Sequence, residues 1–185
     1  MTPLPLTLER VTCPVGTILL MTDDAGAVRV LDFEDYEERM TRLLRLHYGE
    51  NGWTVREATR PSKARKALEA YFAGDLAAID TLQTATNGTA FQRQVWAALR
   101  TIPAGAAWSY GDLADRIGRP KAVRAVGAAN GANPIGLIVP CHRVIGADGS
   151  LTGFGGGLPL KQALLEHEAR VVGHPLDLFS IHARS

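Results

Sequence analysis

Cysteine and long apolar runs are both scarce in this chain of 185 residues, and each scarcity removes a class of protein. Cys13 and Cys141 are the two cysteines, too few for the disulfide framework of a small secreted domain. No apolar run approaches the roughly 20 residues that a membrane-spanning helix needs, and no basic flank precedes an apolar segment near residue 1. We therefore expect a cytoplasmic protein with two reduced thiols and no membrane contact.

Metal-binding spacings are also lacking. The sequence has no C-x-x-C pair and no H-x-x-x-H pair, and Cys13 with His47 supplies too few ligands at no recognisable spacing. We expect no metal and no other cofactor.

Net charge is small as well, but the total of +1 conceals an uneven distribution. Residues 1–85 carry 10 Lys and Arg against 13 Asp and Glu, a balance of −3, whereas residues 86–185 carry 10 against 6, a balance of +4. Four basic residues fall within nine positions that contain no acid: Arg116, Arg119, Lys121 and Arg124. A charge run is usually a solvated surface, yet this asymmetry is the pattern expected if only the second half contacts phosphate.

Local patterns divide the chain near the same place and predict an α+β protein. Alternating runs predict short strands at 6–8, 17–22 and 28–31, and helical spacing predicts helices over 36–47 and 62–72. Ser62, after Pro61, can cap the second of these helices. We expect a small amino-terminal α/β domain over 1–85, in which we find no chemistry, and a second domain over 86–185.

The second half opens with a predicted helix and continues with a predicted helix pair. Thr89 and Gln92 form a capping box, and an apolar stripe follows: Phe91, Val95 and Leu99. Residues 109–117 and 121–130 then predict two short helices joined by a glycine-containing turn, which is typical of a helix-turn-helix.

The second helix of that pair has very little side-chain bulk. Val123 and Val126 can face the core, and the rest of the helix is mostly Ala and Gly around Arg124. Such a helix can approach another surface closely, and Gly127 lowers helix propensity by up to about 1 kcal/mol relative to Ala, which favours an approach role over a stabilising one. The alternative is a buried packing helix.

Cys141 lies in the apolar run 138–145, directly before His142. A neighbouring base favours the thiolate, which is the nucleophilic form of cysteine; the alternative is that Cys141 is a small buried hydrophobe. Further on, Glu168 shares a helix face with Leu164 and Leu165, so its carboxylate points into the core and needs a partner. We expect His142 to be that partner, with Asn133 anchoring the network.

A glycine-rich loop lies between the cysteine and that helix. Six glycines occur between positions 146 and 157, and Phe154 lies among them. Such a loop frees backbone N–H groups to face a ligand. It can equally be a flexible surface loop.

Together these motifs resemble the signature of the O6-alkylguanine-DNA alkyltransferases, also called methylated-DNA–protein-cysteine methyltransferases. The resemblance covers residues 88–170, with every motif in order: Arg124 to Gly127, Asn133-Pro134, Ile138 to Gly146, and Gly155 to Gly157. It implies a ribonuclease-H-like amino-terminal domain and a winged helix-turn-helix domain that holds the active site. The implied partner is double-stranded DNA bearing O6-alkylguanine, bound in the minor groove by a monomer. Cooperative binding along DNA and activity on O4-alkylthymine stay open.

The resemblance also implies roles for single residues. Cys141 would accept the alkyl group in a single turnover, His142 would deprotonate it through a bridging water, and Glu168 would orient the imidazole. Tyr110 would donate to the guanine ring and press on its 3′ phosphate. Arg124 would fill the gap left by the flipped base.

Further residues are implied around the base and along the DNA. The pocket for the flipped base would use the Val144 carbonyl, the backbone N–H groups of Cys141 and Gly155, and the neighbouring Gly156 and Phe154. The implied DNA contacts beside Arg124 are Ala125, Gly127, Ala128 and Arg143. Two positions depart from the family pattern: Phe154 stands where many members carry tyrosine, and Trp108 is bulkier than expected.

Three other functions are compatible with parts of the pattern. A Cys-His-Glu set could serve a thiol hydrolase, although such an enzyme needs no basic helix-turn-helix beside it. A helix-turn-helix regulator without chemistry should carry more base-reading side chains than 121–130 does. A damage-binding relative that transfers nothing would lack the cysteine.

Overall fold

The computed structural model describes residues 2–174, which form two compact units. The amino-terminal unit consists of the described residues up to Gly88 together with Pro134–Ile138. The carboxyl-terminal unit consists of Thr89–Asn133 and the described residues from Val139 on. Helix and sheet are mixed, as expected for an α+β chain, and within residues 2–174 no helix is long and apolar enough to cross a membrane.

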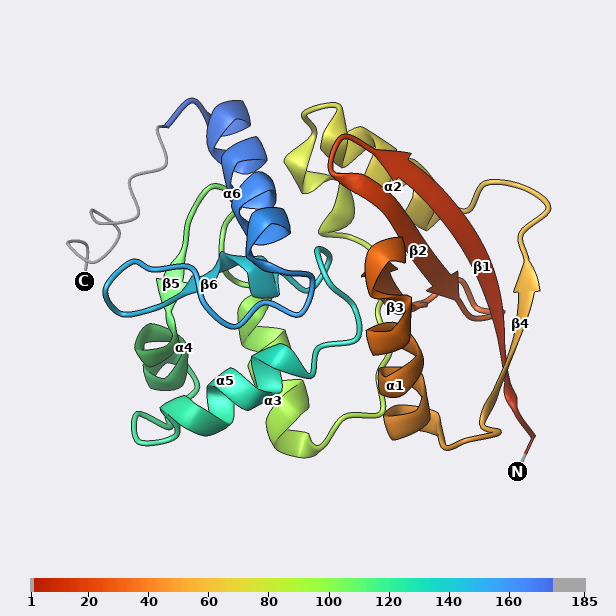
Figure 1. Ribbon diagram of the computed structural model, residues 1–185, viewed down its shortest axis with the longest axis horizontal. Coiled ribbons are helices and arrows are strands. Elements are labelled where there is room, and N and C mark those ends of the chain that lie inside the picture. The colour runs from red at the N-terminus through yellow and green to blue at the C-terminus, as the bar shows by residue number, and fades with distance from the viewer. Residues whose placement is uncertain (1, 175–185) are drawn as a thin grey trace. The chain divides into compact units, whose positions relative to one another are not determined.

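A four-stranded sheet in the order β3-β2-β1-β4 organises the amino-terminal unit (Figure 1). Its strands are β1 (Leu4–Cys13), β2 (Gly16–Thr22), β3 (Val28–Phe33) and β4 (Trp53–Glu57). The first three pair antiparallel in sequence order, and β4 pairs parallel to β1. The predicted strand at 6–8 is therefore the centre of a ten-residue strand. The sequence analysis missed β4 because four of its five residues are exposed and the strand shows no apolar alternation.

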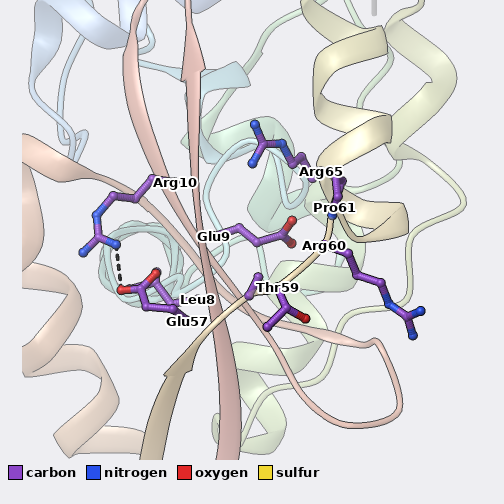
Figure 2. A pocket seen from close by; sticks show the side chains of 9 residues that line it. Leu8, Glu9, Arg10, Glu57, Thr59, Arg60, Pro61 and Arg65 are labelled. Carbon is purple, nitrogen blue, oxygen red and sulfur yellow. Dashed lines mark hydrogen bonds and ion pairs between the residues drawn. The ribbon is translucent and has the colours of Figure 1, made fainter.

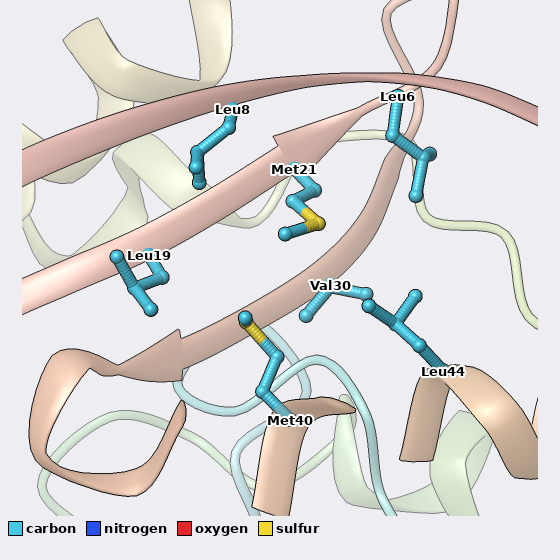
Figure 3. Packing of buried hydrophobic residues seen from close by; sticks show 7 residues of the cluster. All are labelled: Leu6, Leu8, Leu19, Met21, Val30, Met40 and Leu44. Atoms are coloured by element: carbon cyan, nitrogen blue, oxygen red, sulfur yellow. The ribbon is translucent and has the colours of Figure 1, made fainter. Parts of the chain in front are cut away.

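Helix α1 (Glu37–Tyr48) covers one face of this sheet. Residues on a strand alternate between faces, so Leu6 and Leu8 of β1 face the same side. Figure 3 shows how the side chains of this cluster meet: Leu6, Leu8, Leu19, Met21, Val30, Met40 and Leu44. Burial of each such side chain contributes about 1.5–3 kcal/mol, which fixes the helix that the 3.6-residue spacing predicted.

Helix α2 (Lys63–Phe72) begins at Ser62, whose hydroxyl accepts a hydrogen bond from the backbone N–H of Arg65 at 3.0 Å. The predicted cap is confirmed. Ser62 also donates its own backbone N–H to the Glu9 carboxylate at 2.9 Å, which ties the start of the helix to the sheet face opposite α1. A short 3-10 helix, Leu76–Ile79, follows α2, and another, Glu34–Tyr36, precedes α1.

The carboxyl-terminal unit begins with α3 (Ala90–Leu99), which the predicted capping box of Thr89 and Gln92 starts. A pair of helices follows, α4 (Tyr110–Arg116) and α5 (Val123–Gly131). Gly118 ends α4 with a φ of 71°, a conformation that favours glycine. The indole N–H of Trp96 in α3 donates to the Ala129 carbonyl of α5 at 2.8 Å and joins the two helices.

The remainder of this unit is a short parallel strand pair and a long helix. Strands β5 (Trp108–Ser109) and β6 (Val144–Ile145) pair, and α6 (Leu158–Val172) packs against them. The 3-10 helix Cys141–Arg143, labelled η3, runs directly into β6. The candidate nucleophile therefore lies in a tight helical turn directly before a strand.

Helix α5 exposes more of itself than its apolar pattern predicted. Val126 is fully buried, but Val123 is 39 % exposed, so the expectation that both valines face the core is wrong for Val123. The helix begins at Val123 with Ala122 as its cap, and in this first turn a side chain has few neighbours to cover it. Arg124, Ala125 and Ala128 are exposed as well.

Candidate active site in the carboxyl-terminal unit

Cys141 is held at the start of η3 by the chain on either side of it. Its side chain is buried, at 4 % exposure, and it forms no disulfide. Its backbone N–H donates to the Val139 carbonyl at 2.8 Å, and that same carbonyl accepts from the Asn133 amide at 2.9 Å. Asn133 therefore positions the segment leading to Cys141.

His142 and Glu168 form the pair that the sequence predicted. His142 Nε2 lies 2.8 Å from Glu168 Oε1, and both side chains are fully buried. Burial alone would raise the pKa of Glu168, but His142 and Arg143 together hold the pKa of this carboxyl well below its usual range. An ionised carboxylate only accepts hydrogen bonds, so Nε2 of His142 carries the hydrogen and donates it.

The other ring nitrogen of His142 is the reactive feature of the pair. Nδ1 is buried and has no hydrogen-bond partner among the described residues. Burial lowers the pKa of His142 more than the facing Glu168 raises it, so the ring is neutral near pH 7. A neutral ring protonated on Nε2 has an unprotonated Nδ1, which is a base one residue away from the Cys141 sulfur.

Arg143 lies inside the site, and its expected role as a DNA contact is a wrong prediction. Its side chain is 4 % exposed, and its Nε and Nη2 donate to the two Glu168 oxygens at 2.9 and 2.7 Å. Nη1 donates to the Ile102 carbonyl at 2.7 Å, so all three guanidinium nitrogens are engaged inside the unit, and the buried side chain is closed to a phosphate. Such a two-pronged pair neutralises the buried carboxylate and fixes its orientation.

Lys161 is a site residue that the sequence analysis missed. It is fully buried on α6, and its ammonium donates to the carbonyls of Val144 and Thr152. Burial lowers the pKa of Lys161 to about 8. A negative charge on Cys141 would raise that pKa, so the two groups interact electrostatically. Position 161 shares a helix face with Leu164, Leu165 and Glu168. The helical spacing that placed Glu168 in the core therefore also predicts a buried side chain at Lys161.

The buried charges of the site can be counted in pairs. Arg143 compensates Glu168, and His142 is neutral. Lys161 is a further buried cation of the site, and a negative charge on Cys141 interacts favourably with it.

Tyr110 borders the same site from the start of α4. Its hydroxyl donates to the Thr152 carbonyl at 3.1 Å, and burial followed by the Cys141 charge raises the pKa of its phenol, so the hydroxyl keeps its proton. A Cβ at Gly153 would lie 2.9 Å from the Tyr110 oxygen, and the φ of 64° there also favours glycine. This glycine of the loop is therefore required for the placement of the tyrosine.

The remaining predicted pocket residues lie around this group. The Val144 carbonyl accepts a hydrogen bond from Lys161. Gly157 donates to the Phe154 carbonyl at 3.1 Å, which folds the loop into a turn, and a Cβ at Gly156 would come within 2.9 Å of the Phe154 ring. Gly155 and Phe154 are half-buried. Gly127 adjoins Tyr110, since a Cβ there would be in ordinary contact with its ring at 3.8 Å.

The exposed side of the helix pair is strongly basic. Arg116, Arg119, Lys121 and Arg124 are all exposed. Arg116 lies over the ring of Trp108 at 4.4 Å, a cation–π contact that holds its guanidinium in place. Among residues 2–174 no group of three or more His, Cys, Asp or Glu side chains is placed to hold a metal.

Known proteins resemble the chain over nearly its whole length. The family described as "6-O-methylguanine DNA methyltransferase, DNA binding domain" matches residues 90–170. A methylated-DNA–protein-cysteine methyltransferase of Salmonella typhimurium is 52 % identical over 160 residues, covering 86 % of this chain and 94 % of the relative. A protein of the same name from Mycolicibacterium paratuberculosis is 46 % identical over 173 residues, covering 92 % and 97 %.

Solved structures give the same result. The chain is similar to the Mycobacterium tuberculosis OGT crystallised in complex with DNA, with a TM-score of 0.72, 40 % identity, and coverage of 94 % of this chain and 98 % of the other. An O6-methylguanine-DNA methyltransferase from the archaeon Pyrococcus kodakaraensis has the same fold, with a TM-score of 0.62 at 24 % identity and coverage of 88 % and 98 %.

Proposed function

The chain belongs to the family of methylated-DNA–protein-cysteine methyltransferases, and we propose that Cys141 is the sulfur that takes the alkyl group from guanine O6 in damaged DNA. The observation that carries this assignment is the unpartnered Nδ1 of His142, an unprotonated base on the residue that follows the buried Cys141. Cys13 has no such neighbour: its thiol donates to the Gly16 carbonyl at 3.1 Å, and burial raises its pKa.

The first step is removal of the thiol proton. His142 Nδ1 is one residue from the sulfur and has no direct bond to it, so a water between them is the proposed carrier of the proton. The ionised Glu168 stabilises the imidazolium that results, and the Lys161 ammonium stabilises the thiolate. His142 is then a base whose tautomer is set by its carboxylate partner.

The second step is an in-line displacement at the alkyl carbon. The thiolate forms a carbon–sulfur bond, the bond from that carbon to O6 breaks, and the electron pair moves onto the guanine ring. The protonated Tyr110 hydroxyl is placed to leave the Thr152 carbonyl and donate to the ring as negative charge develops there. The product is a thioether, which is chemically stable, so we propose one turnover per molecule.

The basic side of the α4–α5 pair is the proposed DNA-binding surface. Arg124, Ala125 and Ala128 are exposed together, and the small side chains allow the helix to enter a minor groove closely. Arg124 would occupy the space left when the damaged base swings out, a step that costs a few kcal/mol. The finer fold assignments, a winged helix-turn-helix over 86–185 and a ribonuclease-H-like domain over 1–85, belong to this proposal, as do binding as a monomer and a cytoplasmic location.

The test is transfer of a radiolabelled methyl group from an O6-methylguanine duplex. We expect label on the protein to stop at one equivalent, no label on Cys141→Ala, and unchanged duplex affinity of that variant. Arg124→Ala should slow transfer from the duplex by about 10²-fold, equal to the few kcal/mol of base extrusion, and leave reaction with free O6-benzylguanine unchanged. Label on Cys141→Ala, or more than one equivalent on the natural chain, rules the proposal out.

A further inference from the structure

A pocket in the amino-terminal unit has no part in the chemistry described above. It lies where β1 passes the end of β4 and the start of α2, and its volume is about 350 Å³. Figure 2 shows the residues that line it, all of them between positions 8 and 65. Since a water takes about 30 Å³ of liquid, this space exceeds what one or two ordered waters would fill.

Glu9 is the unusual group in this pocket. Its side chain is 3 % exposed, and Oε1 accepts the backbone N–H of Ser62 at 2.9 Å. The second oxygen, Oε2, is buried and has no hydrogen-bond partner among the described residues. In Figure 2 the carboxylate points away from Arg10 and toward the side of the pocket formed by Arg60, Pro61 and Arg65. A buried acceptor without a donor destabilises the folded unit unless a bound molecule supplies the missing hydrogen bond.

The three arginines that line the pocket differ in whether they already form ion pairs with glutamates. Arg10 pairs with Glu57 at 2.8 Å and with Glu34 at 3.8 Å. Arg65 pairs with Glu69 at 2.9 Å. Arg60 is exposed, makes no ion pair among residues 2–174, and in Figure 2 directs its guanidinium away from the Glu9 carboxylate. The pocket therefore holds one carboxylate oxygen without a hydrogen-bond donor, and its rim carries one guanidinium without an ion-pair partner.

We propose that this pocket binds a small molecule carrying a primary ammonium and an acidic group. The ammonium donates to Glu9 Oε2, which supplies the donor that this buried oxygen lacks, and the acidic group pairs with Arg60, whose exposed side chain turns toward it from the rim. Guanidinium binds carboxylate and phosphate with the same two-pronged geometry, so the acidic group belongs to either class. Neither a simple cation nor a simple anion matches both groups, because each would leave one charge of the pocket uncompensated.

The experiment is a two-dimensional ¹H–¹⁵N NMR titration of the full chain. The probes are β-alanine, γ-aminobutyrate and O-phosphoethanolamine, and the single-charge controls are methylammonium and propionate. We expect saturable shifts within residues 8–10 and 57–65 for the two-charge probes only. The tighter binder among β-alanine and O-phosphoethanolamine identifies the acidic group, and the comparison with γ-aminobutyrate gives the spacing.

Two variants and one matched control locate the contacts. Glu9→Gln retains the acceptor for Ser62 and removes the charge, and Arg60→Gln removes the opposite charge at an exposed position where folding is not at risk. Each should weaken binding at least tenfold, whereas Lys66→Gln, which removes an exposed charge of α2 outside the lining, should leave it unchanged. The proposal fails if no probe gives saturable shifts, if methylammonium or propionate binds as tightly as the two-charge probes, or if both pocket variants bind as the natural chain does. None of these outcomes bears on alkyl transfer by Cys141.

Discussion

Each of the two units buries one glutamate, and the two carboxylates have very different surroundings. Glu168 of the carboxyl-terminal unit is fully buried and accepts hydrogen bonds from His142, Arg143 and the backbone of Gly105. Glu9 of the amino-terminal unit is 3 % exposed and accepts from Ser62 through one oxygen only. Both oxygens of Glu168 accept hydrogen bonds from the protein, so this carboxylate is a fixed charge that acts through His142. One oxygen of Glu9 accepts none, so this carboxylate can accept a hydrogen bond from a bound molecule.

Loss of the Glu168 charge is expected to have the largest effect. Glu168→Gln removes the group that keeps Nε2 of His142 protonated and leaves the buried Arg143 without its counter-charge. We expect the rate of methyl transfer to fall by 10²–10⁴-fold, the usual range for a lost general base, and the free energy of unfolding to fall by about 3–5 kcal/mol. Single-turnover kinetics and urea unfolding measure the two.

Glu166→Gln is the matched control on the same helix, because Glu166 is exposed. It should change the free energy of unfolding by less than about 0.5 kcal/mol and leave transfer intact. If Glu168→Gln behaves like this control, the description of Glu168 as the organising charge is wrong.

Arg143 tests the other half of the same network. Arg143→Met should lower the free energy of unfolding by about 3 kcal/mol, because it leaves the Glu168 carboxylate buried without its permanent cation. It should not weaken duplex binding, which fluorescence anisotropy at fixed salt measures. Arg124→Ala, on the exposed helix face, should weaken duplex binding and leave the free energy of unfolding unchanged. A selective loss of DNA affinity in Arg143→Met would restore the role that the sequence suggested.

The charge of Lys161 is expected to have a smaller, pH-dependent effect. The pKa of Lys161 is about 8, below the ordinary value of 10.5, so its positive charge is present below pH 8 and lost above it. Lys161→Met should slow transfer about tenfold at pH 7, equal to about 1.4 kcal/mol of thiolate stabilisation. The ratio of natural to variant rate should approach one by pH 9, and a ratio that is constant from pH 7 to 9 would exclude this electrostatic role.

The smallest effect is expected at Glu9. Glu9→Gln keeps the hydrogen bond from Ser62 and alters only the oxygen that has no hydrogen-bond partner among the described residues, so the free energy of unfolding should change by less than about 0.5 kcal/mol or rise slightly. Urea unfolding at pH 7 gives the value. A loss of several kcal/mol, as at Glu168, would mean that the two carboxylates do not differ in the way described.

The pairing of His142 with Glu168 could be predicted because the spacing of α6 places Glu168 on the apolar face with Leu164 and Leu165. The same argument applies to Lys161, but a lysine is usually solvated, and only the fold shows that its ammonium reaches two backbone carbonyls. Arg143 was misassigned as a DNA contact, a role that the resemblance implied; its position in the apolar run before β6 was the better guide.

Other features depend on contacts between distant segments, which local patterns do not contain. Strand β4 is mostly exposed, and its pairing with β1 gives it its conformation. The 3-10 turn at Cys141 is set in part by Asn133, whose amide donates to the Val139 carbonyl. The spacing of apolar residues in the sequence does not predict this turn. The pocket at Glu9 combines β1, the end of β4 and the start of α2, so its residues come together only in the folded unit.

The central claim is that Glu168 holds His142 as a neutral ring with a bare Nδ1 beside Cys141. ¹⁵N NMR of histidine-labelled protein at pH 7 measures this directly through the chemical shifts of the two ring nitrogens. We expect a protonated Nε2 and an unprotonated Nδ1, and the opposite tautomer in a substantial fraction of Glu168→Gln molecules. A hydrogen on Nδ1 in the natural chain, or a doubly protonated ring at that pH, would contradict it.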